Sequence, residues 1–286
     1  MLEIQVIETS TEIVNKLHKK GEILKEGLLT IVDDEQGFYI LRSETGASAL
    51  GISLKDSIRR VDVKGIEYQG MKPRDAEQSC FFYALKNFAL VVGLGEAGTG
   101  KTTLALAYAL TQLFRNDMNV VLVKPTTFVG RKSNAIAAVP GDHREKLEGY
   151  ISSYLVVLKR IFGNSFEHQL FQLEEEDKLS FMPLELVRGI EFKNSVVIID
   201  EAQNTSPHEL LSLISRVSED SQCIVLGDPN QVDTDIPRRE TGLYVLSNSD
   251  AFIESPFSAG IRLRSQHRGP LATLVSEIIQ ELYEED

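Results

Sequence analysis

The chain has few cysteines and no long apolar run. Its two cysteines, Cys80 and Cys223, are too few for a disulfide framework and too isolated for the paired ligands of a zinc site. The first ten residues lack the basic stretch and the apolar run of a secretory signal. The longest apolar region, residues 81–95, is interrupted by Lys86 and Asn87 and cannot span a bilayer. These absences predict a cytoplasmic protein, of a cell or of a phage-infected cell, that makes no contact with a membrane.

Basic residues are scarce as well. The 286 residues include 30 Lys and Arg against 42 Asp and Glu, a formal net charge of −12. A protein that binds nucleic acid chiefly through its phosphates usually has a basic excess, so any such contact must come from a local patch. The share of hydrophobic residues, 42%, and of charged residues, 25%, is that of an ordinary globular protein and excludes a disordered, collagen-like or coiled-coil chain.

Residues 1–68 differ in pattern from the rest. Three short runs, 28–32, 38–42 and 60–63, are rich in β-branched or aromatic residues and are separated by turn-forming clusters. A helix is predicted over 11–20, where the first residue, a threonine, is available as the N-cap. We therefore predict a small α+β accessory module of two or three strands.

Residues 69–286 alternate between apolar runs, polar loops and helical segments. The apolar runs have the length of buried parallel strands and cover 88–92, 120–123, 195–199 and 223–226. Helices are predicted over 101–113 and 146–162, and a third begins after Ser206, which forms a capping box with Glu209 around Pro207. This alternation predicts a doubly wound α/β domain, whose ligands bind at the carboxyl ends of the strands.

A phosphate-binding loop follows the first predicted strand. The segment GEAGTGKTT fits the pattern G-x-x-x-x-G-K-[ST] and precedes a helix, as the motif requires. Its glycines allow successive N–H groups to face phosphate oxygens, Lys101 would reach the β- and γ-phosphates, and the Thr102 hydroxyl would bind Mg²⁺. The residues expected to bind ATP here are Gly95, Glu96, Ala97, Gly98, Thr99, Gly100, Lys101, Thr102 and Thr103.

Two further polar segments follow predicted strands. Asp200 ends the apolar run SVVIID, where a carboxylate reaches Mg²⁺, and Glu201 beside it is placed to activate an attacking water. Gln231, in the loop GDPNQ, can hold the γ-phosphate or the water and change partners on hydrolysis. Water as the nucleophile favours an ATPase over a small-molecule kinase.

The ordered set GEAGTGKTT, VVIIDEAQN and LGDPNQVD resembles the PhoH family of ATPases, whose RecA-like core is similar to one motor domain of superfamily 1 helicases. The segments KPTT, VPGDHREKLEGY and MPLELVRG extend the resemblance from about residue 66 onward. It implies ATP hydrolysis, and it implies that Gln78 reads the adenine edge. Lys124 replaces the usual arginine, and RKSNAIAAV differs from the usual insert. Residues 1–68 are too few for the nuclease domain of longer members, so we expect no nuclease activity.

Residues 124–160 form a locally basic stretch, with seven Lys and Arg against three acids and a net charge of +4. It follows a core strand, where translocating motors track a phosphate backbone, so we expect contact with single-stranded RNA or DNA. The alternative is an ordinary solvated surface of mixed charge. The residues expected to touch the strand are Thr126, Thr127, Arg131, Lys132 and His143.

Hydrolysis also needs a cation, beyond Lys101, on the charge of the transition state. The segment IRLRSQHRGPL supplies Arg262, Arg264 and Arg268, and it resembles the arginine-containing segment at the end of the family's core. Only one motor domain is predicted, so the cation must come from another subunit or from a loop that folds back. We predict that Arg264 or Arg268 acts from a neighbouring subunit. We therefore expect a ring, with six as the expected number of subunits.

Two classes of function remain open. The first is a Mg²⁺-dependent ATPase or helicase coupled to single-stranded nucleic acid. The second is an ATP-dependent oligomeric switch that acts on a protein partner without nucleic acid. Stimulation of ATP hydrolysis by RNA or DNA separates them.

Overall fold

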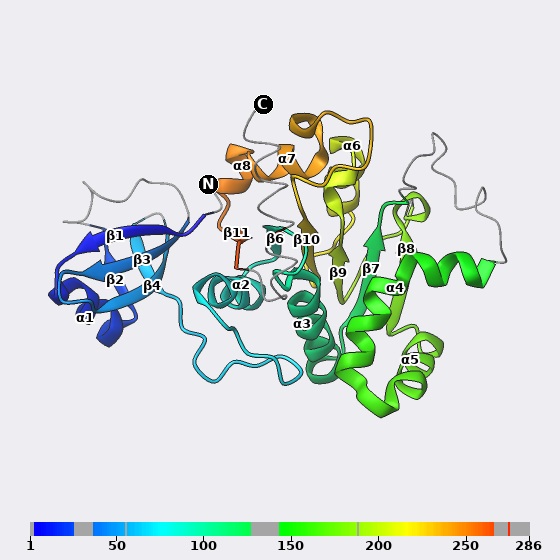
Figure 1. The fold of residues 1–286 in the computed structure, drawn as a ribbon, viewed down its shortest axis with the longest axis horizontal. Coiled ribbons are helices and arrows are strands. Elements are labelled where there is room, and N and C mark those ends of the chain that lie inside the picture. The colour runs from blue at the N-terminus through cyan, green and yellow to red at the C-terminus, as the bar shows by residue number, and fades with distance from the viewer. Residues whose placement is uncertain are drawn as a thin grey trace.

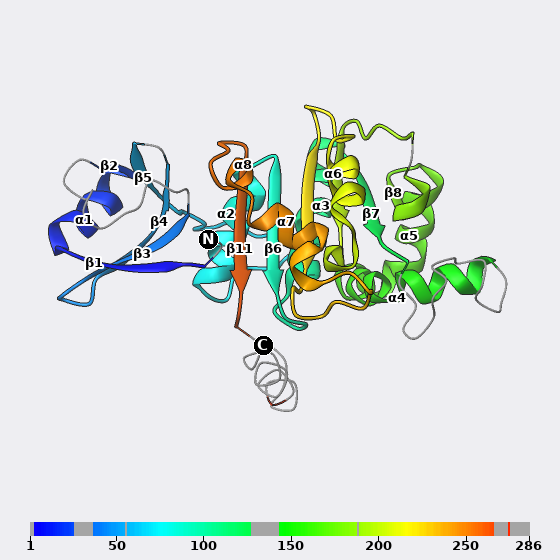
Figure 2. The ribbon, with the colours of Figure 1, turned by 90° about the horizontal axis from the view of Figure 1, so that it is seen from above.

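The computed structural model describes residues 3–25, 37–54, 56–126, 143–187, 189–265 and 274, and for 143–150 it describes the backbone alone. Within these ranges the chain forms two sheets with helices packed on them (Figure 1, Figure 2). One sheet comes from the N-terminal part and the other from the remainder. No helix of the described ranges is long and apolar enough to cross a membrane.

The N-terminal sheet has five strands, more than the two or three predicted. In the order β1-β3-β4-β5-β2, only β1 and β3 are parallel neighbours. The sequence analysis missed three of them because short segments rich in polar residues or glycine become strands only through their neighbours. The strands are β1 (Gln5–Thr9), β2 (Glu22–Leu24), β3 (Phe38–Ser43), β4 (Ser48–Ser53) and β5 (Ser57–Arg60).

Two boundaries in this part differ from the prediction. Helix α1 (Thr11–Lys20) is capped by Ser10, whose hydroxyl accepts a hydrogen bond from the Ile13 N–H at 3.3 Å, so the assignment of Thr11 as the cap is wrong. Of the strand predicted over 60–63, only Arg60 lies in a strand, because β5 covers Ser57–Arg60. The strand predicted over 28–32 lies outside the described residues.

The second sheet has six strands, all parallel, in the order β11-β6-β10-β9-β7-β8. It confirms the predicted doubly wound parallel α/β fold, and the four predicted strands are its central ones. The two edge strands were missed, because an edge strand has one sheet neighbour and less need for a continuous apolar run. The strands are β6 (Leu90–Gly95), β7 (Asn119–Lys124), β8 (Leu179–Pro183), β9 (Ser195–Ile199), β10 (Gln222–Gly227) and β11 (Ser258–Leu263).

Helices cover both faces of this sheet (Figure 1). One hydrophobic core joins α2, α3, α4 and α5 to the sheet, and a second joins α6, α7 and α8 to its other face. The capping box predicted at Ser206 and Glu209 is confirmed. The helices are α2 (Ala76–Asn87), α3 (Lys101–Asn116), α4 (His143–Phe162), α5 (Phe166–Glu175), α6 (Pro207–Ile214), α7 (Gly242–Ser247) and α8 (Asp250–Ile253).

The N-terminal sheet packs against α2. Phe38 of β3 and Ile52 of β4 belong to the same hydrophobic core as α2, and the rings of Phe38 and Tyr83 meet edge to face at 6.4 Å. Glu3, near the N-terminus, pairs with Arg262 and Arg264 at the end of β11. The α+β composition of this part agrees with the sequence analysis, and the division of the chain at residue 68 stays a proposal.

Candidate nucleotide-binding site

The loop between β6 and α3 follows the path that the glycine pattern predicts. Gly95, Gly98 and Gly100 have φ angles of 145°, 96° and 93°, a region that residues with a side chain rarely adopt. The Thr99 hydroxyl donates a hydrogen bond to the Glu96 carbonyl at 3.0 Å and closes the turn. The loop thus places the first turn of a 16-residue helix directly behind a concave backbone, the arrangement that binds phosphate.

Gly95 also lies against strand β11. A Cβ atom at this position would be 2.2 Å from the backbone oxygen of Leu263, far inside contact distance. We expect Gly95→Ala to destabilise the protein by about 3 kcal/mol, because the side chain meets backbone and the φ angle is strained. Gly163→Ala is the matched control, since Gly163 also has a positive φ but an added Cβ meets nothing within 4 Å.

Urea unfolding of both variants measures this difference. The control should lose only about 1 kcal/mol, the cost of a left-handed backbone with a side chain. Equal losses in the two variants would show that the contact with Leu263 does not constrain the loop.

Lys101 lies inside the loop. Its side chain is almost fully buried, and its ammonium donates to the carbonyl of Gly95 and, at 2.8 Å, to that of Glu96. The charge therefore faces the concave side of the backbone. A buried ammonium that donates to carbonyl oxygens keeps its positive charge and is a strong attractor for an anion.

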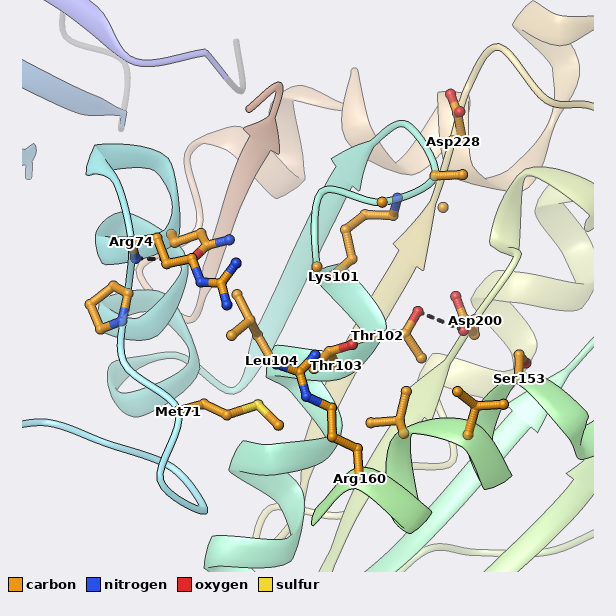
Figure 3. Close-up of a pocket in the computed structure, with 18 of the residues that line it drawn as sticks. Met71, Arg74, Lys101, Thr102, Thr103, Leu104, Ser153, Arg160, Asp200 and Asp228 are labelled. Carbon is orange, nitrogen blue, oxygen red and sulfur yellow. Dashed lines mark hydrogen bonds between the residues drawn. The ribbon is translucent and has the colours of Figure 1, made fainter. Parts of the chain in front are cut away.

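Thr102 and Asp200 come together from distant parts of the sequence. The Thr102 hydroxyl donates to a carboxylate oxygen of Asp200 at 3.0 Å, as Figure 3 shows. Burial raises the pKa of Asp200 and the neighbouring Glu201 raises it further, whereas the hydrogen bond from Thr102 and the charge of Lys101 oppose the shift. A cation bound here would instead lower the pKa of Asp200, because it favours the charged carboxylate.

Gln203 links Glu201 to the loop after β10. Its amide nitrogen donates to the Glu201 carboxylate at 2.7 Å and to the Gln231 carbonyl at 3.1 Å, and its amide oxygen accepts from the Asp228 N–H at 3.0 Å. The side chain has no exposed surface. The sequence analysis missed Gln203, although its place two residues after Glu201 in the segment DEAQ was a usable signal.

We expect Gln203→Ala to lower kcat about tenfold and to leave the affinity for ATP within about twofold, because the amide orients Glu201 and does not line the cavity. Gln172→Ala, on the exposed surface of α5, is the control. Steady-state kinetics and ATP titration separate the two constants. A change in affinity with kcat unaltered would mean that Gln203 does not position Glu201.

Asp228 was also missed by the sequence analysis. It is 5% exposed, one carboxylate oxygen accepts from the Asn230 N–H, and the other has no hydrogen-bond partner among the residues that the structure describes. Burial raises the pKa of Asp228, while the positive charges of Lys101 and Arg262 lower it. Asp228 thus places a further carboxylate, besides those of Asp200 and Glu201, on the wall of the cavity.

Gln78 is buried at the start of α2. Its amide oxygen accepts from the Arg74 N–H at 3.0 Å, and its amide nitrogen donates to the Thr99 carbonyl at 3.3 Å. The side chain therefore braces the phosphate-binding loop against residues 72–75. Reading of the adenine edge by Gln78 stays a prediction, because both ends of the amide are engaged with backbone here.

Lys101, Thr102, Asp200, Glu201 and Asp228 line one cavity of about 920 Å³. It extends along the first turn of α3, from residues 67–78 on one side to Asp200 and Glu201 on the other, and α4 forms a further wall (Figure 3). The volume is in the range of sites that hold a whole cofactor-sized ligand. Segments far apart in the sequence meet at this cavity because parallel strands direct their carboxyl ends to one edge of the sheet.

A comparison with protein families gives the match that decides the identity of this site. The model of the family described as PhoH-like protein matches residues 70–280. The chain belongs to the PhoH-like protein family. The P-loop site described above is therefore that of a PhoH-like P-loop NTPase, and the resemblance stated from the motifs is confirmed.

The curated relatives that this chain matches are longer than the matched region. Protein PhoH2 of Bacillus subtilis (strain 168) is 29% identical over 85% of this chain and 56% of its own length, and Protein PhoH of Escherichia coli (strain K12) is 33% identical over 58% and 45%. The chain thus spans about half the length of the curated relatives it matches. A Pif1 helicase from Candida albicans is 16% identical over 74% of this chain and 44% of its own, with a TM-score of 0.38, too low to support an argument.

Of the two arginines predicted to stabilise the transition state of this PhoH-like chain, the structure describes Arg264, which lies apart from the cavity of its own chain. The Arg264 side chain is exposed and bonds Glu3, while its N–H donates to Glu77 at 2.6 Å. Arg264 is not among the residues that line the cavity. Arg268 lies outside the described residues.

The predicted contacts with a nucleic-acid strand receive little support from the geometry. Thr126 is 4% exposed, and its hydroxyl donates to the Glu185 carboxylate at 2.6 Å, so it is not presented to a strand. Glu185 was not predicted and comes from the segment MPLELVRG. His143 begins α4, and its side chain is not described. Three further predicted contacts lie outside the described residues, namely Thr127, Arg131 and Lys132.

Proposed function

We propose that this PhoH-like chain is a Mg²⁺-dependent ATPase that couples hydrolysis to binding or unwinding of single-stranded RNA or DNA as an oligomeric ring. The contact between Thr102 and Asp200 beside Lys101 is the observation that carries the proposal. It joins the helix that follows the phosphate loop to the end of β9, where hydrolysis would take place.

The residues at this point fit Mg²⁺. A hydroxyl and a carboxylate, both hard oxygen donors, lie 3.0 Å apart beside the phosphate loop, and Mg²⁺ commonly binds one or two such protein ligands together with phosphate oxygens. Thr102 and Asp200 would hold the ion. When bound, it would neutralise charge on the phosphates.

The protein's own groups then serve distinct roles. Lys101 binds the phosphates and stabilises the negative charge that develops on their oxygens in the transition state. Glu201 accepts the proton of the attacking water, and Gln203 holds the Glu201 carboxylate in place. Because Gln203 also bonds Gln231 and Asp228, release of phosphate can alter the position of the loop 228–231.

The arginine that stabilises the charge of the transition state would come from a neighbouring subunit. Arg264 of the same chain is engaged by Glu3 and lies off the cavity, which supports a donor in trans over one in cis. Gel filtration with and without ATP tests the ring, for which six subunits are expected. A strict monomer that hydrolyses ATP at the full rate would exclude it.

ATP hydrolysis measured with and without single-stranded RNA and DNA tests the coupling. Stimulation that disappears at high salt is expected, because contact would depend on the local charge of residues 124–160 within an acidic chain. Hydrolysis without stimulation or binding at low salt would favour the oligomeric switch on a protein partner. Absence of hydrolysis in the presence of Mg²⁺ would exclude both.

A further inference from the structure

Helix α4 presents a separate face to the nucleotide cavity. Ile151, Tyr154 and Leu158 are buried against the sheet and attach the helix to the core. The residues that line the cavity repeat at intervals of three and four, which places them on one adjoining face. They are Ser153, Val156, Val157 and Arg160.

Arg160 is the charged residue of that face. Its side chain extends from α4 across the cavity toward Thr103 and Leu104, on the first turn of α3 (Figure 3). Within the described ranges no hydrogen bond or ion pair joins Arg160 to another residue. By contrast, Lys72 on the same cavity pairs with Glu67 at 3.4 Å. Arg160 therefore brings a guanidinium, unpaired among the side chains that the structure describes, to the cavity wall beside the first turn of α3.

The position of Arg160 along the cavity indicates which phosphate it would contact. Asp200 marks the metal side of the site, and Arg74 marks the opposite side (Figure 3). The Gln78 amide, to which the sequence resemblance assigns the base, accepts from the Arg74 N–H. The Arg160 side chain points toward the first turn of α3, between these two ends (Figure 3). A triphosphate bound along this turn would present to Arg160 the phosphate nearest the ribose, with the far phosphates at Lys101.

We propose that Arg160 is a nucleotide-binding residue that contacts the α-phosphate of the bound nucleotide from within the same chain. The contact rests on the proposed function, since it requires that the cavity take a nucleoside triphosphate. A guanidinium suits this role, because it offers a fixed fork of donors to phosphate oxygens. It would also tie α4 to the presence of nucleotide.

Arg160→Ala tests the contact, with Lys159→Ala as the matched control. Lys159 is the adjacent exposed residue of α4, it carries the same charge, and it does not line the cavity. ATP, ADP and adenosine are each titrated against the full chain by calorimetry with Mg²⁺ present. Alanine favours helix at an exposed position, so both variants should fold.

In Arg160→Ala the Kd for ATP and for ADP should each rise about tenfold, and the Kd for adenosine should change less than about twofold. Lys159→Ala should leave all three within about twofold. Binding of ADP to Arg160→Ala as tight as to Lys159→Ala would overturn the proposal, as would a loss confined to ATP or an equal loss for adenosine. Failure of the unaltered chain to bind ATP or ADP would instead overturn the proposed function, and this contact with it.

Discussion

Glu201→Gln is expected to lower the turnover of ATP by about 100-fold to 10,000-fold while ATP remains bound, because glutamine cannot accept a proton from water. The carboxylate of Glu201 already accepts a hydrogen bond from Gln203 at 2.7 Å. A glutamine can keep that bond through its amide oxygen. The substitution therefore removes the base and preserves the shape of the site.

Phosphate release and ATP titration on the same preparation measure the two quantities. Glu219→Gln is the control, since Glu219 is an exposed carboxylate outside the cavity and its loss should change neither. Hydrolysis that survives Glu201→Gln at more than about a tenth of the original rate would show that Glu201 is not the base. Asp228, which begins the loop 228–231 and also lines the cavity, would then be the next candidate for the base.

Lys101→Met should weaken the binding of ATP by about 100-fold or more. The ammonium lies inside the phosphate loop, and without it the carboxylates of Asp200, Glu201 and Asp228 remain on the adjacent part of the cavity wall. Methionine occupies a similar volume and carries no buried charge. The fold without nucleotide should therefore lose less than about 1 kcal/mol of stability.

Nucleotide titration and thermal unfolding together test this expectation. Lys193→Met is the control, because Lys193 is exposed and pairs with Glu191 away from the site. ATP should raise the unfolding temperature of the control and not that of Lys101→Met. ATP binding by Lys101→Met that is as tight as in the control would contradict the assignment of the phosphate site.

Local patterns predicted the elements whose causes are local. The phosphate loop needs glycines at fixed positions because the backbone itself takes a left-handed course at Gly98 and Gly100. The capping box at Ser206 and Glu209 closes within four residues. The central strands are buried on both faces, so their continuous apolar runs identify them.

Elements that depend on a distant neighbour were predicted less well. Strands β8 and β11 are edges of the large sheet, and β1 pairs in parallel with β3 across an intervening helix. Thr126 was expected on the surface, yet it is buried under Glu185, which is 59 residues away. A period of two or of 3.6 residues carries no information about such partners.

The sequence by itself determined the family and the parallel α/β class. It also predicted a nucleotide site at Lys101, Thr102, Asp200 and Glu201, because each of these residues belongs to a short motif with its own backbone requirement. Only the tertiary structure decided that Gln203 joins Glu201 to the loop 228–231, that Glu3 engages Arg264, and that α4 turns Arg160 toward the first turn of α3. These contacts depend on how the sheet brings strand ends and helices together. Side chains that meet across the fold leave no regular spacing along the chain.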